Sequence, residues 1–194
     1  MTITTDLQRQ LVNYIVEHSG HEPHRRYIGL SGISDCEQVI YDRYIHGTPA
    51  TIGERMKTAI SYDLERVLIE KLTALRLYRK GEDINLYNGL VQGHTDGWIQ
   101  DDLLEIKTVE REEWFPQHHL PFRVFYQIQA YLHFLDIQFA QVIYLARDNG
   151  AVQVYKERRD ARRGDEIARK AERLVTAVTT MQRPECTCGR CNPK

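Results

Sequence analysis

The most constraining feature of the chain is a pair of strand-like segments that bring two acids and a lysine to one place. Asp96 follows the first segment, and Glu105-Ile106-Lys107 lies on the second. Side chains alternate between the two faces of a strand, so Glu105 and Lys107 point the same way and Ile106 points into the core. Polar turn residues, Gln100-Asp101-Asp102, separate the segments. The pattern predicts a hairpin that presents two carboxylates and an ammonium group together.

This set of groups suits metal-assisted chemistry. Carboxylate oxygens are the ligands that Mg²⁺ and Mn²⁺ prefer, and a bound ion can activate water for attack on phosphorus. We expect Asp96, Glu105 and the carbonyl of Ile106 to bind the ion. Lys107 would orient the water and offset the developing negative charge. A salt bridge between Lys107 and Glu105 is the alternative, and it is compatible with the catalytic role.

The cysteines give the second signal. Three of the four lie in the last nine residues, as Cys186, Cys188 and Cys191, and the fourth is Cys36. In a cytosolic chain this clustering favours a metal site over disulfides. Four thiolates suit a tetrahedral zinc ion or an iron–sulfur cluster, and both stay open at this point. Unrelated free thiols in a frayed tail are the remaining alternative.

The surroundings of Cys36 predict how such a site would be built. Ser34-Asp35-Cys36-Glu37 has the pattern of a capping box, with Ser34 as the N-cap. Cys36 would then lie in the first turn of a helix, where the helix dipole favours a thiolate. Joined to the tail, it would fasten the C-terminus to the N-terminal part of the fold as a structural clamp.

Size and charge limit the classes of protein. A chain of 194 residues suits one domain with a substantial core. The net charge of −1 means that contact with nucleic acid would depend on local patches, of which Lys156–Arg163 is the most basic. We find no apolar run of roughly 20 residues and no signal-peptide pattern at the start. We therefore expect a cytoplasmic protein without a membrane partner.

Periodicity predicts the order of the elements. Helical spacing of apolar residues covers 6–19, 34–47, 54–77, 122–136 and 160–182. Strand-like segments cover 83–87, 90–100, 103–110, 139–147 and 151–156. This mixture predicts an α/β or α+β fold. The aromatic segment 111–121 could grip a DNA strand by stacking or could serve as a packed connector.

Two motifs together resemble a known superfamily. The pattern Asp96…Glu105-x-Lys107 resembles the PD-(D/E)XK nucleases, and Gln127-x-x-x-Tyr131 resembles a helix motif of the RecB-like nucleases. Residues at i and i+4 share one helix face, so both can address one site. The one-plus-three cysteines resemble the iron–sulfur branch of that group, which includes the CRISPR-associated Cas-four type and phage exonucleases. The resemblance runs from Ser31 to Cys191.

The resemblance implies a fold and further site residues. It implies a restriction-endonuclease-like central mixed sheet flanked by helices. Residues 1–194 would form one nuclease domain, with 1–50 and 183–194 contributing the subregion of a 4Fe–4S cluster bound by the four cysteines. The family has a G-x-x-x-(E/H) motif on the helix before the sheet. Ser61 to Glu65 fits it best, so Glu65 is the expected third acid and metal ligand, with Glu54 as the weaker choice. Gln127 and Tyr131 would position the phosphate or brace the carboxylates.

The expected function is a Mg²⁺- or Mn²⁺-dependent DNA exonuclease. The family suggests 5′→3′ degradation of single-stranded DNA in recombination, repair or CRISPR spacer acquisition, with an integrase or recombination protein as partner. A homo-oligomer, such as a ring around DNA, is compatible with this role. Two alternatives remain at this point. One is a non-catalytic DNA-binding assembly factor, and the other is a structure-specific endonuclease with a zinc-stapled tail.

Overall fold

A five-stranded mixed sheet forms the framework of the computed structural model, which describes residues 10, 13–14, 26–48, 50–186 and 188. The strands lie in the order β2-β5-β6-β7-β8. Their bounds are Tyr78–Lys80, Gly97–Ile99, Asp102–Val109, Phe139–Ala146 and Val152–Arg158. β6 and β7 are parallel, and the other neighbours are antiparallel. A parallel pair needs a crossover connection, which here contains helix α4 (Phe122–Phe134).

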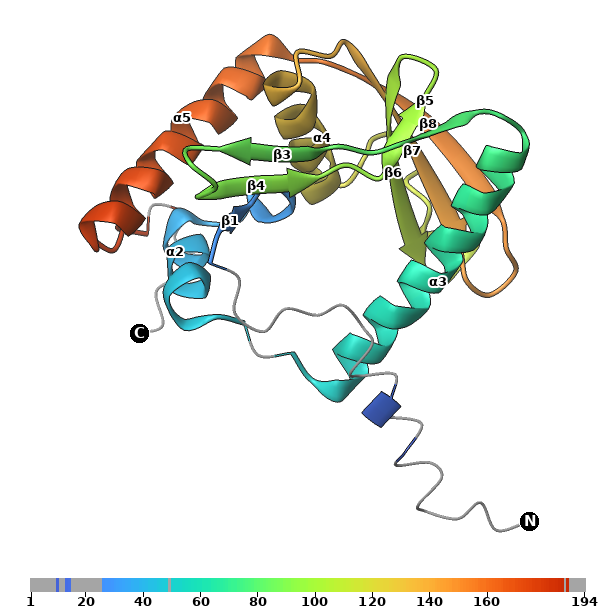
Figure 1. Ribbon diagram of the computed structural model, residues 1–194, viewed down its shortest axis with the longest axis horizontal. Coiled ribbons are helices and arrows are strands. Elements are labelled where there is room, and N and C mark those ends of the chain that lie inside the picture. Colours follow the sequence, from blue (N-terminus) through green and yellow to red (C-terminus); the bar gives the residue numbers. More distant parts are fainter. Residues whose placement is uncertain (1–9, 11–12, 15–25, 49, 187, 189–194) are drawn as a thin grey trace.

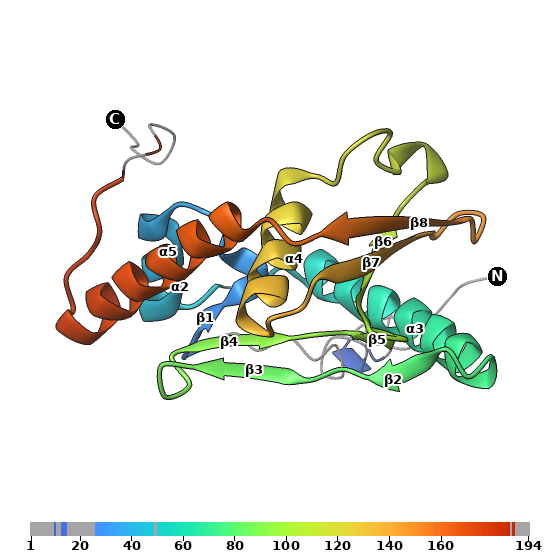
Figure 2. The ribbon, with the colours of Figure 1, turned by 90° about the horizontal axis from the view of Figure 1, so that it is seen from above.

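A smaller sheet extends from this framework. It contains β1 (Ile28–Gly29), β4 (Val91–His94) and β3 (Asp83–Leu86), in the order β1-β4-β3. The chain passes from the small sheet to the large one between β4 and β5, at Thr95 and Asp96 (Figure 2). The predicted strand 90–100 is therefore two strands in different sheets.

Helices cover both faces of the large sheet (Figure 1). Helix α3 (Ile52–Ala74) packs Leu72 on one face, against Leu104 and Ile106. On the other face, α4, α2 (Glu37–His46) and α5 (Ala161–Thr180) share the larger core with β6 and β7. The prediction of a mixed sheet flanked by helices is confirmed. No described helix is long and apolar enough to cross a membrane.

The starts of α2 and α3 correct one prediction. The N-cap of α2 is Cys36, with no side-chain hydrogen bond, so the capping box predicted at Ser34 is wrong. The carboxylate of Asp35 pairs with Arg43 and Arg123 at this point. A capping box does occur at α3, where Thr51 N–H donates to Glu54 Oε2 at 2.7 Å. Glu54, the weaker candidate for the third acid, is thus occupied at the helix start.

Most other elements were predicted with shifted ends. The predicted helix 54–77 ends at Ala74, because the chain turns through a left-handed residue, Arg76 (φ 57°), into β2. β1 and β2 were not predicted; they are two and three residues long, too short for a periodic pattern. The predicted helix 6–19 lies almost wholly outside the described residues.

Candidate active site and cysteine group

Asp96 is fixed beside β6 where the chain changes sheets. Its Oδ2 accepts a 2.6 Å hydrogen bond from Ile106 N–H, and its carbonyl accepts one from the Tyr78 hydroxyl at 3.0 Å. The next residue must be small, because a Cβ on Gly97 would lie 2.3 Å from the Tyr78 ring. The strand break therefore turns the Asp96 carboxylate toward the edge of β6 that β5 leaves uncovered.

Glu105 is the buried centre of the site, with 2% of its surface exposed. Its Oε1 accepts hydrogen bonds from Lys107 Nζ at 2.5 Å and from Gln127 Nε2 at 2.7 Å. Lys107 Nζ also donates to Gln127 Oε1 at 3.1 Å. The expected alternation is present, since Glu105 and Lys107 face α4 while Ile106 packs under α3.

Gln127 and Tyr131 lie on one face of α4, above Glu105. Gln127 Nε2 is also 3.1 Å from the Tyr131 hydroxyl, which is nearly fully buried. A Cβ on Gly93 of β4 would come 2.8 Å from the Tyr131 ring. Glycine at position 93 of the small sheet therefore leaves room for that ring. The structure thus brings both residues of the predicted helix motif to Glu105 and Lys107.

Glu65 approaches the same place from α3. One turn earlier on this helix, Ser61 Oγ accepts a 2.8 Å hydrogen bond from Thr108 Oγ1 of β6. Residues at i and i+4 share a helix face, so this bond fixes the register that directs Glu65 toward the site. The Glu65 and Asp96 carboxyl groups interact by hydrogen bonding as well as by charge.

Burial and mutual repulsion raise the pKa values of the three acids. Burial, followed by repulsion from Glu65, raises the pKa of Asp96 to about 7. Burial outweighs the attraction of Lys107 and raises the pKa of Glu105 to about 7. Burial and the charge of Glu105 also raise the pKa of Glu65. Ionising these groups together is costly without more positive charge, and a divalent cation would supply it.

Donor atoms for such a cation are present. Glu105 Oε2 is buried and has no hydrogen-bond partner among the described residues. The N–H and C=O of a strand residue point to the same edge. Since Ile106 N–H meets Asp96, the Ile106 carbonyl also faces the edge beyond the end of β5. Two carboxylates and a carbonyl fit Mg²⁺ or Mn²⁺.

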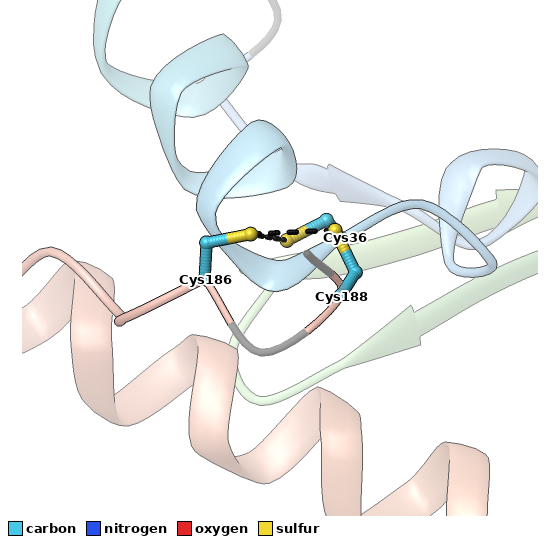
Figure 3. A group of neighbouring side chains, drawn as sticks. All are labelled: Cys36, Cys186 and Cys188. Carbon is cyan, nitrogen blue, oxygen red and sulfur yellow. Dashed lines mark hydrogen bonds between the residues drawn. The ribbon is translucent and has the colours of Figure 1, made fainter. Parts of the chain in front are cut away.

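The acids are nevertheless less tightly gathered than the cysteines. Cys36, Cys186 and Cys188 have sulfur atoms that all lie within 4.8 Å of one another (Figure 3). Within the described part of the chain, no other set of three Cys, His, Asp or Glu residues brings its ligand atoms so close together. The Sγ atoms of Cys36 and Cys186 are 3.7 Å apart, and those of Cys186 and Cys188 are 3.3 Å apart. These are too long for disulfides. Three converging thiols fit a thiolate-bound metal, and Cys191 lies outside the described residues.

Ion pairs hold the C-terminal segment beside the cysteine group. Arg173 of α5 contacts Glu37 at 2.6 Å, and Arg183 contacts Asp42 at 2.5 Å. Lys170 donates to the carbonyl of Asp35 at 2.5 Å. The C-terminal segment is thus held beside α2 by these charged contacts, and they place Cys186 and Cys188 next to Cys36.

Two residues around the acids escaped the sequence reasoning. Thr108 sets the position of α3, and Tyr144 of β7 lies beside Lys107 in the sheet register. Both residues lie on largely apolar strands, and neither belongs to a recognisable sequence motif. Pairing β6 with β7 in parallel register from the sequence would have placed Tyr144 next to the lysine.

Comparison with known proteins supports the fold. No protein-family model matches the chain, and no curated protein matches it. The phage-related exonuclease from Haemophilus somnus 129PT superposes with a TM-score of 0.63 at 12% identity, over 80% of this chain and 94% of its own. The alkaline exonuclease LHK-Exo from Laribacter hongkongensis gives 0.57 at 12% identity, over 80% and 89%. SSO0001 gives 0.58 at 17% identity, over 95% and 93%. The chain therefore has the fold that the alkaline and phage-related exonucleases share.

Proposed function

We propose that the protein is a divalent-metal-dependent DNA exonuclease of the PD-(D/E)XK type. One observation carries this proposal. Glu105 is buried with one oxygen paired to Lys107 and Gln127, while its other oxygen has no partner among the described residues, beside a second carboxylate whose pKa is also raised. An unpaired buried carboxylate oxygen beside a second acid destabilises the metal-free fold, and a bound cation would give that oxygen a partner.

Each side chain has a role in this reaction. Asp96, Glu105 and the Ile106 carbonyl would hold the ion, with Glu65 bound directly or through water. When bound, such an ion would lower the pKa of a coordinated water and stabilise negative charge on the phosphate. Lys107 orients the attacking water and offsets negative charge. Gln127 holds Glu105 Oε1 and Lys107 in place, which leaves Oε2 free for the ion, and Tyr131 braces Gln127.

The fold neighbours and the resemblance both support DNA as the proposed substrate. The neighbours include exonucleases, and LHK-Exo has been crystallised with dAMP. We assign DNA as the substrate, single strands in the 5′→3′ direction as the preferred mode, and recombination, repair or CRISPR spacer acquisition as the setting. An integrase or recombination protein would be the partner. The exposed Trp114, after β6, is available to stack on a base.

We assign a 4Fe–4S cluster, with a structural role, to Cys36, Cys186, Cys188 and Cys191. A single zinc ion is a second candidate with an observation in its favour. A tetrahedral ion with bonds of 2.3 Å places its sulfurs about 3.8 Å apart, close to the separations of 3.3 and 3.7 Å found here. In a cluster each thiolate binds a different iron, which spreads the sulfurs further. Elemental analysis of anaerobically purified protein separates the two.

The test of the function is cleavage of end-labelled single- and double-stranded DNA with Mn²⁺. We expect wild type to cut and Asp96→Ala to be inactive. Asp101→Ala, in the exposed β5–β6 turn, is the matched control and should remain active. The ladder from each labelled end gives the polarity, and closed circular DNA detects endonuclease activity. If metal-loaded wild type binds DNA but cuts none of these substrates in Mn²⁺ or Mg²⁺, the assembly-factor alternative replaces the enzyme.

A further inference from the structure

A tyrosine beside the candidate site has an unexplained hydroxyl group. Tyr144 of β7 is 3% exposed, and its hydroxyl oxygen is buried with no hydrogen-bond partner among the described residues. Burying an unpaired hydroxyl is unfavourable, and replacing it with an apolar group of the same shape is neutral or stabilising. A position that only fills the core would therefore favour phenylalanine, so the hydroxyl calls for another reason.

The sheet register places this hydroxyl group next to the catalytic candidates. Tyr144 is the direct partner of Lys107 in the parallel β6–β7 pair, and Glu105 is the partner of Val142. Side chains directly opposite each other share a face, so Tyr144 faces α4 with Lys107 and Glu105. Neighbouring strands are about 4.8 Å apart, which makes Tyr144 an immediate neighbour of Lys107 and a diagonal neighbour of Glu105.

The ring of Tyr144 is held in place by two aromatic neighbours. Phe115, from the segment after β6, meets it edge-on with centroids 6.2 Å apart, and Tyr155 of β8 does so at 5.5 Å. Tyr155 also donates a hydrogen bond to the Pro116 carbonyl at 2.5 Å, which fastens that segment over the sheet. The Tyr144 hydroxyl therefore has little freedom to seek a partner elsewhere.

Two unpaired buried oxygens thus lie on one face of neighbouring strands, the Tyr144 hydroxyl and Glu105 Oε2. Burial, followed by the electrostatic effects of Tyr155 and Glu105, raises the pKa of Tyr144 to about 12, so the hydroxyl stays neutral. A cation bound at Glu105 Oε2 would bring water to this face, because Mg²⁺-like ions keep several waters when bound by few carboxylates. Such a water can donate a hydrogen bond to the Tyr144 hydroxyl oxygen, and the two unpaired oxygens would then both have partners.

We propose that Tyr144 is a positioning residue of the metal site, whose hydroxyl oxygen accepts a hydrogen bond from a water bound to the divalent ion at Glu105. The inference rests on the proposed function, since it takes that ion as given. Groups that hydrogen-bond to the ligands of a metal typically change its affinity or activity by about 10- to 100-fold. Tyr144 would act by fixing where the ion and its water lie, without contacting the DNA.

The test compares Tyr144→Phe with wild type by Mn²⁺ titration calorimetry and by melting with and without Mn²⁺. We expect the variant to melt at the same or a higher temperature in EDTA, and to bind Mn²⁺ at least about 10-fold more weakly. Cleavage should fall at a fixed Mn²⁺ concentration and recover in part at higher Mn²⁺. Tyr155→Phe, which loses only the bond to Pro116, should keep wild-type affinity for Mn²⁺.

The outcomes separate this inference from the function on which it rests. If wild type and Tyr144→Phe bind Mn²⁺ equally and show the same dependence of cleavage on Mn²⁺, the role of Tyr144 is overturned while the enzyme stands. If wild type binds no Mn²⁺ and cuts no DNA, the proposed function falls first, and the role of Tyr144 falls with it. If Tyr155→Phe weakens Mn²⁺ binding as much as Tyr144→Phe does, general loosening of the segment explains the loss and the proposal is wrong.

Discussion

Replacing the candidate ligand Asp96 with asparagine should stabilise the metal-free protein. The amide oxygen of asparagine can still accept the hydrogen bond from Ile106 N–H, so the local geometry is kept. What disappears is the charge, which is buried beside Glu65 and raised in energy by both burial and repulsion. The substitution thus removes a functional group whose charge opposes folding.

The size of the effect follows from the pKa of Asp96, which is about 7 in the folded protein against an ordinary value of 3.8. Because the folded state binds this proton more tightly than the unfolded state does, ionisation lowers the free energy of unfolding as the pH rises. The loss is absent well below pH 4, reaches about 2 kcal/mol at pH 5 and levels off near 4 kcal/mol above about pH 7. Glu65 and Glu105 titrate together with Asp96, so these figures are upper values for one charge removed from a coupled set.

Thermal melting in EDTA at pH 5 and pH 8 tests this reasoning. In a chain of this size, about 4 kcal/mol corresponds to an increase in Tm of about 10 °C, so Asp96→Asn should melt about that much higher at pH 8 and far less so at pH 5. Mn²⁺ should raise the Tm of wild type at pH 8 and leave the variant nearly unchanged. Asp101→Asn is the surface control. A variant that melts at or below the wild-type temperature at pH 8 would refute the account.

Two further predictions concern packing and the cysteine group. Gly93→Ala places a Cβ 2.8 Å from the Tyr131 ring and should lower the free energy of unfolding in urea by about 1–3 kcal/mol, whereas Gly53→Ala, with nothing within 4 Å, should not lower it. Equal stability of the two would show that the small sheet gives way freely. Cys36→Ser should lose the bound metal in elemental analysis and melt at a lower temperature than wild type. An unchanged metal content and Tm would exclude Cys36 as a ligand.

The parts of the site that the sequence predicts are those with local periodicity. Alternation along β6 places Glu105 and Lys107 on one face, and helical spacing on α4 places Gln127 and Tyr131 on one face. Both follow from backbone geometry within a single element, so neither needs knowledge of the rest of the fold. That the two faces meet at Glu105 depends on the parallel pairing of β6 with β7 and on the crossover through α4, and this pairing was not predicted from the sequence.

The strand break at Asp96 could not be predicted in this way, because it depends on contacts with the connection between β2 and β3. Thr95 N–H donates to the Glu82 carbonyl at 3.1 Å, and its hydroxyl accepts from Glu82 N–H at 2.8 Å. A Cβ on Gly81 would lie 1.9 Å from the Thr95 carbonyl, so the turn fits only glycine there. These contacts, formed 13 residues apart, end β4 and free Asp96 from the ladder.

The prediction of a capping box at the start of α2 was wrong for a related reason. The contacts found there also connect the cysteine group to the candidate site. Asp35 precedes Cys36, and its carboxylate pairs with Arg123 in the first turn of α4 at 2.7 Å. Gln127 follows Arg123 by one helical turn and holds Glu105 and Lys107. A metal bound at the cysteine group would therefore act next to Asp35, whose ion pair with Arg123 links the start of α2 to the helix that carries Gln127. A short-range capping rule misses the role of Asp35 because its carboxylate pairs with Arg43, eight residues away, and with Arg123, 88 residues away.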